Sequence, residues 1–321
     1  MTSTNGLDRR AFLTRGVVGG SLLVGATRAT DEKKRPALGS ATGVAIERAP
    51  GERRDVRRSL KWGMVGEGDS VLAKFRMLAE LGYDGVELDS PSYADLDEVL
   101  AAIEETGVVV PGVVNSMHWI KTLGDRDAAV RAEGVKFLET ALRDAKKVGA
   151  TTVLLVPAVV GPDVSYRDAW ERSQAEIRRV LPLAAELGVT IAFENVWNNF
   201  LLSPLEAARY VDELESEWVG WYLDIGNVVH YGWPEHWVEA LGTRIVKCDV
   251  KDYSRGKCNN EGLWHGFDVE IGEGDANYPR VMKALDRIGY RGWFSAEVGG
   301  GGRDRLAEVL RRMDAGLQSG T

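Results

Sequence analysis

TIAFENVW, residues 190–197, is a short apolar run that ends on a carboxylate, Glu194. Three later runs have the same form: WYLDIGN reaches Asp224, RIVKCDVKD reaches Asp249 and WFSAEVG reaches Glu297. The steps between the four acids are 30, 25 and 48 residues, about the length of a strand, a loop and a helix with one longer insertion. In a closed parallel barrel, the carboxyl ends of all strands surround one cavity. The spacing therefore predicts that the four acids meet at one rim.

Four carboxylates that share a cavity repel each other unless a cation lies between them. The sequence therefore predicts one divalent metal held by Glu194, Asp224, Asp249 and Glu297. Alternation along the third of these runs supports this prediction, because Lys247, Asp249 and Lys251 fall on one face of the expected strand. That polar face must be the barrel interior, and its two lysines could offset part of the negative charge.

From Ser59 onward, strand-like runs alternate with amphipathic helical segments, which is typical of a parallel sheet. Eight such pairs can be counted, so we expect an α/β fold, a (β/α)8 TIM barrel, over residues 59–321. The chain has 321 residues and is 44% apolar, which suffices for the core of such a barrel. The expected strands cover residues 59–64, 84–88, 107–115, 151–156, 189–194, 219–224, 244–250 and 292–298. We expect Asp69 to cap the first helix, Pro182 to kink or break the helix over 166–188, and 253–277 to form a long irregular lid or substrate loop.

The first 58 residues differ in composition from the rest. Arg9 and Arg10 precede the small, apolar stretch 16–29, which has the form of a twin-arginine export signal over residues 1–29. That stretch is too short and too rich in glycine for a membrane span, so we expect an exported, periplasmic protein without a stable span. Residues 30–58 are highly charged and are interpreted as a linker.

Charge and cysteine content narrow the list of partners. The net charge is −8 with no long basic cluster in the folded portion, which argues against nucleic acid as a partner. Of the two cysteines, Cys248 alternates with valines and is expected to be a buried thiol rather than half of a disulfide. Six tryptophans fall beside strand ends or in loops and could stack on sugar rings or simply pack; they are Trp62, Trp119, Trp197, Trp233, Trp264 and Trp293.

Six strings occur in one order over residues 59–315: GYDGVELDSP, FENVWNNFLLSP, YLDIGNV, RIVKCDVKD, IGEGDANYPRVMKAL and GYRGWFSAEV. Together they resemble the sugar isomerase/epimerase superfamily of xylose isomerase-like TIM barrels, and within it the proteins described as sugar-phosphate or hexulose-6-phosphate isomerases/epimerases. The resemblance implies metal ligands at Glu194, Asp224, Asp249 and Glu297. The family usually has a histidine where this chain has Asp249. Four carboxylates favour a hard cation, Mn²⁺ or Mg²⁺, over Zn²⁺.

The resemblance also implies that Glu194 and Glu297 are the acid–base pair of a ketose isomerase or 3-epimerase. Such an enzyme removes a proton beside the substrate carbonyl, passes through an enediolate and returns a proton. The remaining candidates for contact with the small-molecule sugar, each also compatible with an ordinary structural role, are His118, Asn227, Arg255, Glu87, Lys251 and Trp62.

Several alternatives stay open at this level. A dehydratase or lyase could use the same base and metal, and a non-catalytic sugar-binding protein could retain the barrel. The zinc endonuclease branch of the superfamily fits poorly, because this chain has four histidines and an acidic balance. The glycine-rich strings GEGD, residues 272–275, and GGGG, residues 299–302, could bind a substrate phosphate or merely form turns. Export argues for an unphosphorylated sugar, and a homo-oligomer is compatible with the sequence.

Overall fold

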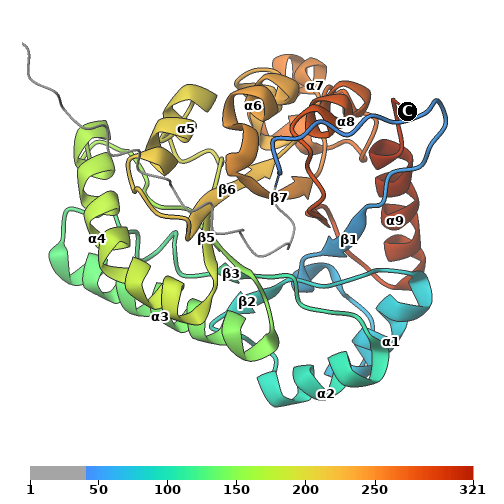
Figure 1. Ribbon diagram of the computed structural model, residues 1–321, viewed down its shortest axis with the longest axis horizontal. Helices are drawn as coiled ribbons and strands as arrows, with labels where there is room; N and C mark the ends of the chain where they lie inside the picture. The colour runs from blue at the N-terminus through green and yellow to red at the C-terminus, as the bar shows by residue number, and fades with distance from the viewer. Residues whose placement is uncertain (1–40, 321) are drawn as a thin grey trace, which may run out of the picture. The chain divides into compact units, whose positions relative to one another are not determined.

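The computed structural model describes residues 41–320, which lie within one compact unit that begins at Ala37. Eight parallel strands occur among these residues: β1 (Arg57–Leu60), β2 (Leu88–Ser90), β3 (Gly112–Asn115), β4 (Thr152–Leu155), β5 (Thr190–Glu194), β6 (Val219–Asp224), β7 (Ile245–Val250) and β8 (Trp293–Ala296). They pair in the order β1-β8-β7-β6-β5-β4-β3-β2. A parallel bridge between Lys61 and Glu87 joins the two ends of this order. The sheet is therefore the predicted (β/α)8 barrel (Figure 1).

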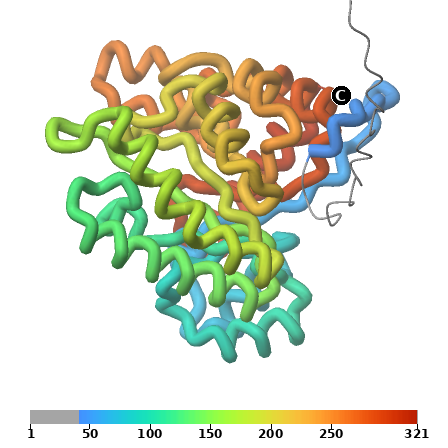
Figure 2. Tube along the Cα trace, turned by 60° about the vertical axis from the view of Figure 1, so that its left-hand side comes forward, coloured from blue at the N-terminus to red at the C-terminus, as the bar shows by residue number. Residues whose placement is uncertain are grey.

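Helices follow the strands and surround them. They are α1 (Val71–Leu81), α2 (Leu96–Thr106), α3 (Ala128–Val148), α4 (Tyr166–Leu187), α5 (Pro204–Asp212), α6 (Pro234–Leu241), α7 (Arg255–Glu261), α8 (Tyr278–Arg287) and α9 (Arg303–Leu317). Short 3₁₀ segments are η1 (Trp62–Met64), η2 (Asn227–His230), η3 (Gly242–Arg244) and η4 (Leu263–Phe267). Figure 2 shows α3 and α4 packed side by side on the outside of the sheet. No helix within residues 41–320 has the length and apolarity needed to cross a bilayer.

Local sequence explains most helix boundaries. Ser203 accepts a hydrogen bond from the Glu206 backbone and Pro204 occupies the first turn, so α5 begins where capping chemistry predicts. The cap of α1 is Ser70 rather than Asp69, because the Ser70 hydroxyl accepts the Ala73 amide. Pro182 lies inside α4 without ending it.

Several expected boundaries were wrong. Strand one ends at Leu60, and the chain turns into η1 instead of continuing to 64. Strand two covers Leu88–Ser90 rather than 84–88, and strand three begins at Gly112 rather than at Gly107, which is the left-handed C-cap of α2 at φ 73°. The segment 253–277 is not irregular throughout, since it contains α7 and η4.

Residues 41–56 are also not a free linker. The Gly43 and Ile46 amides donate to carbonyls of Ile288 and Asp286, at the end of α8. Arg54 is buried and its guanidinium pairs with the Asp286 carboxylate at 2.9 Å. This charged segment therefore belongs to the barrel unit, and its charges are partly matched by residues more than 200 positions away.

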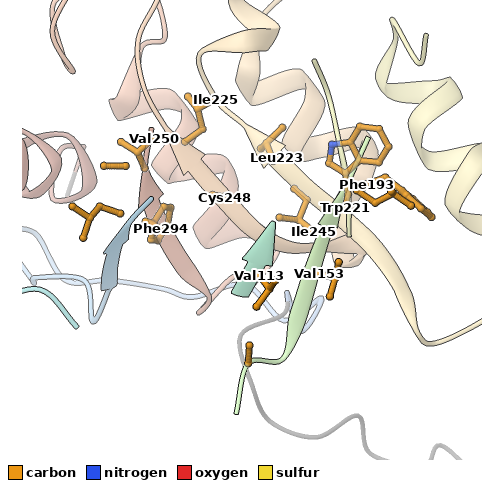
Figure 3. Packing of buried hydrophobic residues seen from close by; sticks show 14 of the residues in the cluster. Val113, Val153, Phe193, Trp221, Leu223, Ile225, Ile245, Cys248, Val250 and Phe294 are labelled. Carbon is orange, nitrogen blue, oxygen red and sulfur yellow. The ribbon is translucent and has the colours of Figure 1, made fainter. Parts of the chain in front are cut away.

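The main core lies between the outer face of the sheet and the helices. Strand side chains such as Val153, Phe193, Trp221 and Phe294 point outward into this layer (Figure 3). Cys248 is among them as a buried free thiol, as its alternation predicts. The inside of the barrel differs, because it holds only a small apolar cluster of Leu154, Ala192 and Tyr222 beside many polar groups. The polar interior of the barrel can therefore hold a functional site.

Candidate active site

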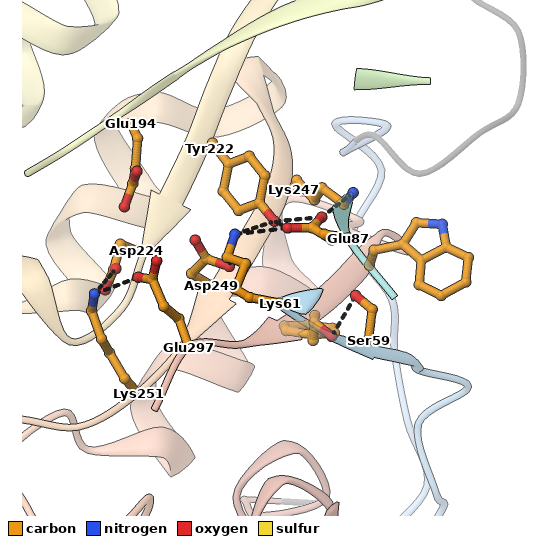
Figure 4. A network of polar contacts seen from close by, with 12 residues as sticks. Ser59, Lys61, Glu87, Glu194, Tyr222, Asp224, Lys247, Asp249, Lys251 and Glu297 are labelled. Atoms are coloured by element: carbon orange, nitrogen blue, oxygen red, sulfur yellow. Dashed lines mark hydrogen bonds and ion pairs between the residues drawn. The ribbon is translucent and has the colours of Figure 1, made fainter. Parts of the chain in front are cut away.

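The four strand-end acids come together inside the barrel mouth. Glu194 and Asp224 are the last residues of β5 and β6, Asp249 is the fifth residue of β7, and Glu297 directly follows β8. Parallel register places Asp224 beside Asp249, and Asp249 beside Ser295 of β8. One oxygen from each of the four carboxylates lies within 4.8 Å of the others. We call this group the carboxylate ring (Figure 4).

The ring carries more negative charge than its surroundings compensate. Burial and repulsion from Glu297 hold the pKa of Glu194 well above its ordinary value. Burial also raises the pKa of Asp249 and of Asp224, although nearby lysines oppose the shift. The Oδ2 atom of Asp249 is buried without a hydrogen-bond partner. A divalent cation would satisfy both the charge and this oxygen, and an all-oxygen donor set suits Mg²⁺ or Mn²⁺.

Lys251 reaches into the ring from just beyond β7. Its ammonium lies 2.7 Å from Asp224 Oδ2 and 2.6 Å from Glu297 Oε2. Because of Lys251 and Lys61, the pKa of Glu297 lies below its ordinary value even though burial acts in the opposite direction. Lys251, proposed from sequence as a sugar contact, therefore holds two of the acids and also lines the cavity.

Lys61 is a site residue that sequence reasoning missed. Its ammonium lies 2.9 Å from Asp249 Oδ1 and 2.7 Å from Glu87 Oε2. Lys61 directly follows β1 and lies two positions after Ser59, so strand alternation could have placed it on the inner face. The carboxylate of Asp249, which stands where the family usually has a histidine, therefore has an ammonium beside it.

Glu87 does not lie at the rim, where a contact with a sugar hydroxyl was expected. It is 1% exposed, its carboxylate pairs with Lys61 and Lys247, and the Tyr222 hydroxyl donates to it at 2.8 Å. Despite burial, the two lysines lower the pKa of Glu87 to about 2. We call Lys61, Glu87, Tyr222 and Lys247 the inner ion cluster (Figure 4). Counted as ionised, the five carboxylates of ring and cluster face three lysines, Lys61, Lys247 and Lys251, which leaves the charge that one divalent ion neutralises.

Asparagines from two loops fix the ring. Asn227 donates from its side chain to Glu194 Oε1 at 3.4 Å and from its backbone to Asp224 Oδ1 at 2.8 Å. Asn195 accepts the Asp224 amide and the Trp221 indole N–H on its side-chain oxygen. Asn227 lines the cavity, whereas Asn195 acts from behind the ring.

His118 lies on the cavity wall opposite these loops. Its ring is 5% exposed and its Nδ1 accepts the Val156 amide at 3.2 Å. Burial lowers the pKa of His118 to about 3, so the imidazole is neutral. Because Nδ1 accepts, the proton resides on Nε2, which makes that atom a hydrogen-bond donor.

Arg255 and Trp62 are not where substrate contact requires them. Arg255 donates to the carbonyls of Val229 and Gly232 and lies 5.0 Å from the Trp233 ring. Trp62 packs against Phe75, with 6.1 Å between ring centroids. Neither side chain lines the cavity above the ring. The structure thus gives neither expectation support, because local position in a loop does not fix side-chain direction.

The cavity above the ring has a volume of about 1000 Å³. One wall comes from the loop after β3, with Ser116, His118 and Trp119, and another from η4 and the residues that follow it. The rings of Trp264 and Phe267 both lie 4.9 Å from the ring of Trp197, measured between centroids. Carboxylates at the floor and aromatic rings on the walls suit a polyhydroxylated ligand.

Comparison with known proteins agrees with this geometry. The family model described as xylose isomerase-like TIM barrel matches residues 75–315. The chain belongs to this family. L-ribulose-5-phosphate 3-epimerase of Shigella boydii serotype 18 is 30% identical over 267 residues, which cover 77% of this chain and 89% of that protein. The Escherichia coli (strain SE11) enzyme of the same name has the same identity and coverage.

Solved structures of low sequence identity share the fold. The 3-keto-D-glucoside 4-epimerase of E. coli is 17% identical with a TM-score of 0.66 over 82% of this chain and 99% of that chain. A D-tagatose 3-epimerase-like protein is 18% identical with a TM-score of 0.68 over 81% and 97%. Membership of the sugar isomerase/epimerase superfamily, as the sequence motifs predict, is confirmed, and with it the isomerase class of the enzyme.

Proposed function

We propose that this protein is a divalent-metal-dependent epimerase or isomerase of ketoses, with Glu194 and Glu297 as the acid–base pair. One observation carries the proposal: the carboxylate ring forms the floor of a cavity of about 1000 Å³ that both glutamates line. The names of the 30% identical relatives favour 3-epimerisation over aldose–ketose isomerisation.

The two glutamates have opposite electrostatic environments, as acid–base work requires. Lys251 keeps Glu297 ionised, and its side chain is 39% exposed toward the cavity, so it can accept the proton from carbon. Glu194 also lines the cavity, so it can return a proton to the substrate. In the metal-free protein, burial and Glu297 raise the pKa of Glu194. Asn227 orients Glu194 through its amide.

Other residues position the substrate and the charge that develops on it. Glu194, Asp224, Asp249 and Glu297 would hold a divalent ion, which when bound would stabilise the negative charge formed as the proton leaves carbon. The Nε2–H of neutral His118 can donate to a substrate oxygen without adding a charge. The Trp197 ring, which lines the cavity, orients the reacting sugar and excludes water.

Proton NMR in D₂O tests this proposal. The full-length chain is stripped with a chelator, reloaded with Mg²⁺ and incubated with a panel of ketoses. We expect loss of the signal of the proton beside the carbonyl and growth of the 3-epimer, both abolished by the chelator. A product lacking the elements of water would instead indicate a dehydratase. Tight sugar binding without any exchange would indicate a binding protein.

We also propose that residues 1–29 export the protein through a twin-arginine route. These residues lie outside the part that the structure describes, and Arg9 and Arg10 carry the proposal. Residues 1–40 fused to a reporter should direct it to the periplasm, and replacement of both arginines by lysine should stop this. A reporter that stays in the cytoplasm with the unmodified segment would contradict the proposal.

A further inference from the structure

Carboxylates of this chain accept backbone hydrogen bonds at both glycine-rich segments that could bind a phosphate. In GEGD, the amides of Gly272 and Ala276 donate to Asp252 at 3.0 Å each, and Tyr253 donates to the same carboxylate at 2.8 Å. Asp252 is 2% exposed and is thus held as an internal anion. The backbone donors that a phosphate would need are consumed.

The second segment, GGGG before α9, is occupied in the same way. The Arg303 amide, at the first residue of α9, donates to Glu67 Oε2 at 2.8 Å. Gly301 donates to the Met64 carbonyl and accepts from the Gly66 amide, so its backbone groups are used in pairing with the loop after β1. A methyl group on Gly302 would lie 2.6 Å from Glu67 Oε2, which shows how closely that carboxylate occupies the helix N-terminus.

Side-chain charges around the cavity also oppose an anion. Among residues 41–320, seven acidic side chains line the cavity against two basic ones, Lys251 and Arg305. Lys251 is engaged by the ring. Arg305 pairs with Glu270 at 2.9 Å and donates to the Gly299 carbonyl at 2.9 Å. A phosphorylated substrate would therefore meet mostly acidic side chains, and both basic side chains described at the cavity are already engaged in ion pairs.

Size and shape point to a ligand with more than one ring. The cavity volume of about 1000 Å³ is at the upper end of the range of about 300–1,000 Å³ for small-molecule sites, whereas one sugar ring is a small ligand. Trp119 and Trp264 line the cavity and are 48% and 67% exposed. They come from the loops after β3 and β7, which lie on opposite sides of the eight-stranded barrel. Exposed indole faces at the mouth offer stacking surfaces beyond the ring that reacts.

We infer that the substrate is an uncharged saccharide whose reacting keto-sugar carries a second sugar unit, seated against Trp264 at the cavity mouth. This inference rests on the proposed function for the reacting unit. It departs from the substrate named for the 30% identical relatives, which is a sugar phosphate. The departure follows from Asp252 and Glu67, which accept backbone amides at the two glycine-rich segments considered for phosphate.

A matched set of three ketoses tests the inference: D-fructose, D-fructose 6-phosphate and isomaltulose, which is fructose with glucose on the same 6-oxygen. Exchange of the proton beside the carbonyl is measured for each with the full-length Mg²⁺-loaded protein. We expect kcat/KM for isomaltulose to exceed that for D-fructose 6-phosphate by at least about tenfold, since one poorly matched charge suffices for that ratio. An equal or higher value for the phosphate would overturn the inference.

The second-unit site is tested with Trp264→Ala and a matched control, Trp233→Ala. Trp233 is 54% exposed and does not line the cavity. Trp264→Ala should raise KM for isomaltulose about tenfold, as expected for loss of one stacking surface, and change kcat/KM for D-fructose less than about twofold. Trp233→Ala should leave both unchanged. Equal losses for both sugars in Trp264→Ala would contradict a second-unit site.

Failure of the proposed reaction is distinguishable from failure of this inference. If no ketose exchanges, tryptophan fluorescence titrations with isomaltulose and D-fructose 6-phosphate still report binding. Saturable binding of isomaltulose, weakened by Trp264→Ala and not by Trp233→Ala, would support the inference while the proposed reaction fails. Preferred binding of D-fructose 6-phosphate, or no binding of either ligand, would overturn the inference.

Discussion

The inner ion cluster and the carboxylate ring occupy adjacent layers of one barrel, yet their charges are handled in opposite ways. In the cluster, Glu87 is paired with two lysines and a tyrosine hydroxyl, and its pKa falls to about 2. In the ring, Glu194 and Asp249 have raised pKa values, and an oxygen of Asp249 lacks a hydrogen-bond partner. Buried charges that are paired stabilise the fold, whereas buried carboxylates with raised pKa values and unpaired oxygens are typical of metal-binding and catalytic sites.

The largest expected effect is on catalysis, from changes within the ring. Glu194→Gln and Glu297→Gln should each lower proton exchange by about 10²- to 10⁴-fold, the usual contribution of one acid–base group. Stability should be kept in Glu194→Gln, which removes a carboxylate from a repelling set, and should fall modestly in Glu297→Gln, because Lys251 loses one ion-pair partner. Exchange rates by NMR and thermal unfolding check this. Exchange near the wild-type rate in either variant would remove that glutamate from the mechanism.

Removal of the lysine that joins the two layers should mainly affect folding. Lys61→Met leaves Glu87 and Asp249 each without one ammonium in a buried site, so the free energy of unfolding should fall by about 3–5 kcal/mol. Lys136→Met, at an exposed position of α3, is the control and should be near neutral. Urea unfolding measures both. Equal stability of the two variants would show that Lys61 is not a required counter-ion.

A smaller effect on stability is expected from a change in the inner ion cluster, which should leave catalysis nearly unchanged. Tyr222→Phe removes only the hydroxyl that donates to Glu87, which should cost about 1.5–3 kcal/mol of stability, as for a hydrogen bond to a charged group. Exchange activity should change little. A large activity loss at unchanged stability would instead place Tyr222 in the reaction.

The two layers should also give the metal-free protein opposite pH dependences. Glu87, with a lowered pKa, stabilises the fold above its ordinary value of 4.5, and this contribution is lost as pH falls toward about 2. Glu194, Asp224 and Asp249 have raised pKa values, so their contribution is complete below their ordinary values and is lost as pH rises through the raised ones.

We therefore expect chelated protein to lose stability on the alkaline side by at most about 1.4 kcal/mol per pH unit for each proton released. Added Mg²⁺ should abolish this slope, because metal replaces the protons. Urea unfolding from pH 5 to 9, with chelator or with Mg²⁺, measures both curves. Identical stability curves with chelator and with Mg²⁺ would contradict an excess of negative charge in the carboxylate ring.

The sequence predicts the ring more completely than the cluster, for a physical reason. Each ring acid ends an apolar run, and parallel strand ends must meet, so Glu194, Asp224, Asp249 and Glu297 could be grouped without coordinates. Alternation also placed Lys247 inside. Glu87 was misjudged and Lys61 was missed. Alternation from Ser59 could have placed Lys61 inside, but its pairing with Glu87 depends on the closure of β1 on β2, which no local pattern encodes.

Long-range pairing also explains the error at residues 41–56. Their charge density is typical of a linker, but Arg54 is matched by Asp286, 232 positions later. Arg255 and Trp62 were assigned to the site by position along the chain, and the structure turns both side chains toward other neighbours. Direction of a loop side chain depends on packing that the sequence does not show locally.

Calorimetric titration of Mn²⁺ into chelator-treated full-length protein tests whether the carboxylate ring binds a metal ion. We expect one site per chain. Asp224→Asn, which removes a ring charge, should weaken binding at least about tenfold, and Tyr222→Phe, which alters only the inner ion cluster, should leave it unchanged. Circular dichroism confirms that both variants are folded. Absence of binding to the wild-type chain, or equal affinity in Asp224→Asn, would contradict the assignment of the carboxylate ring as the metal site.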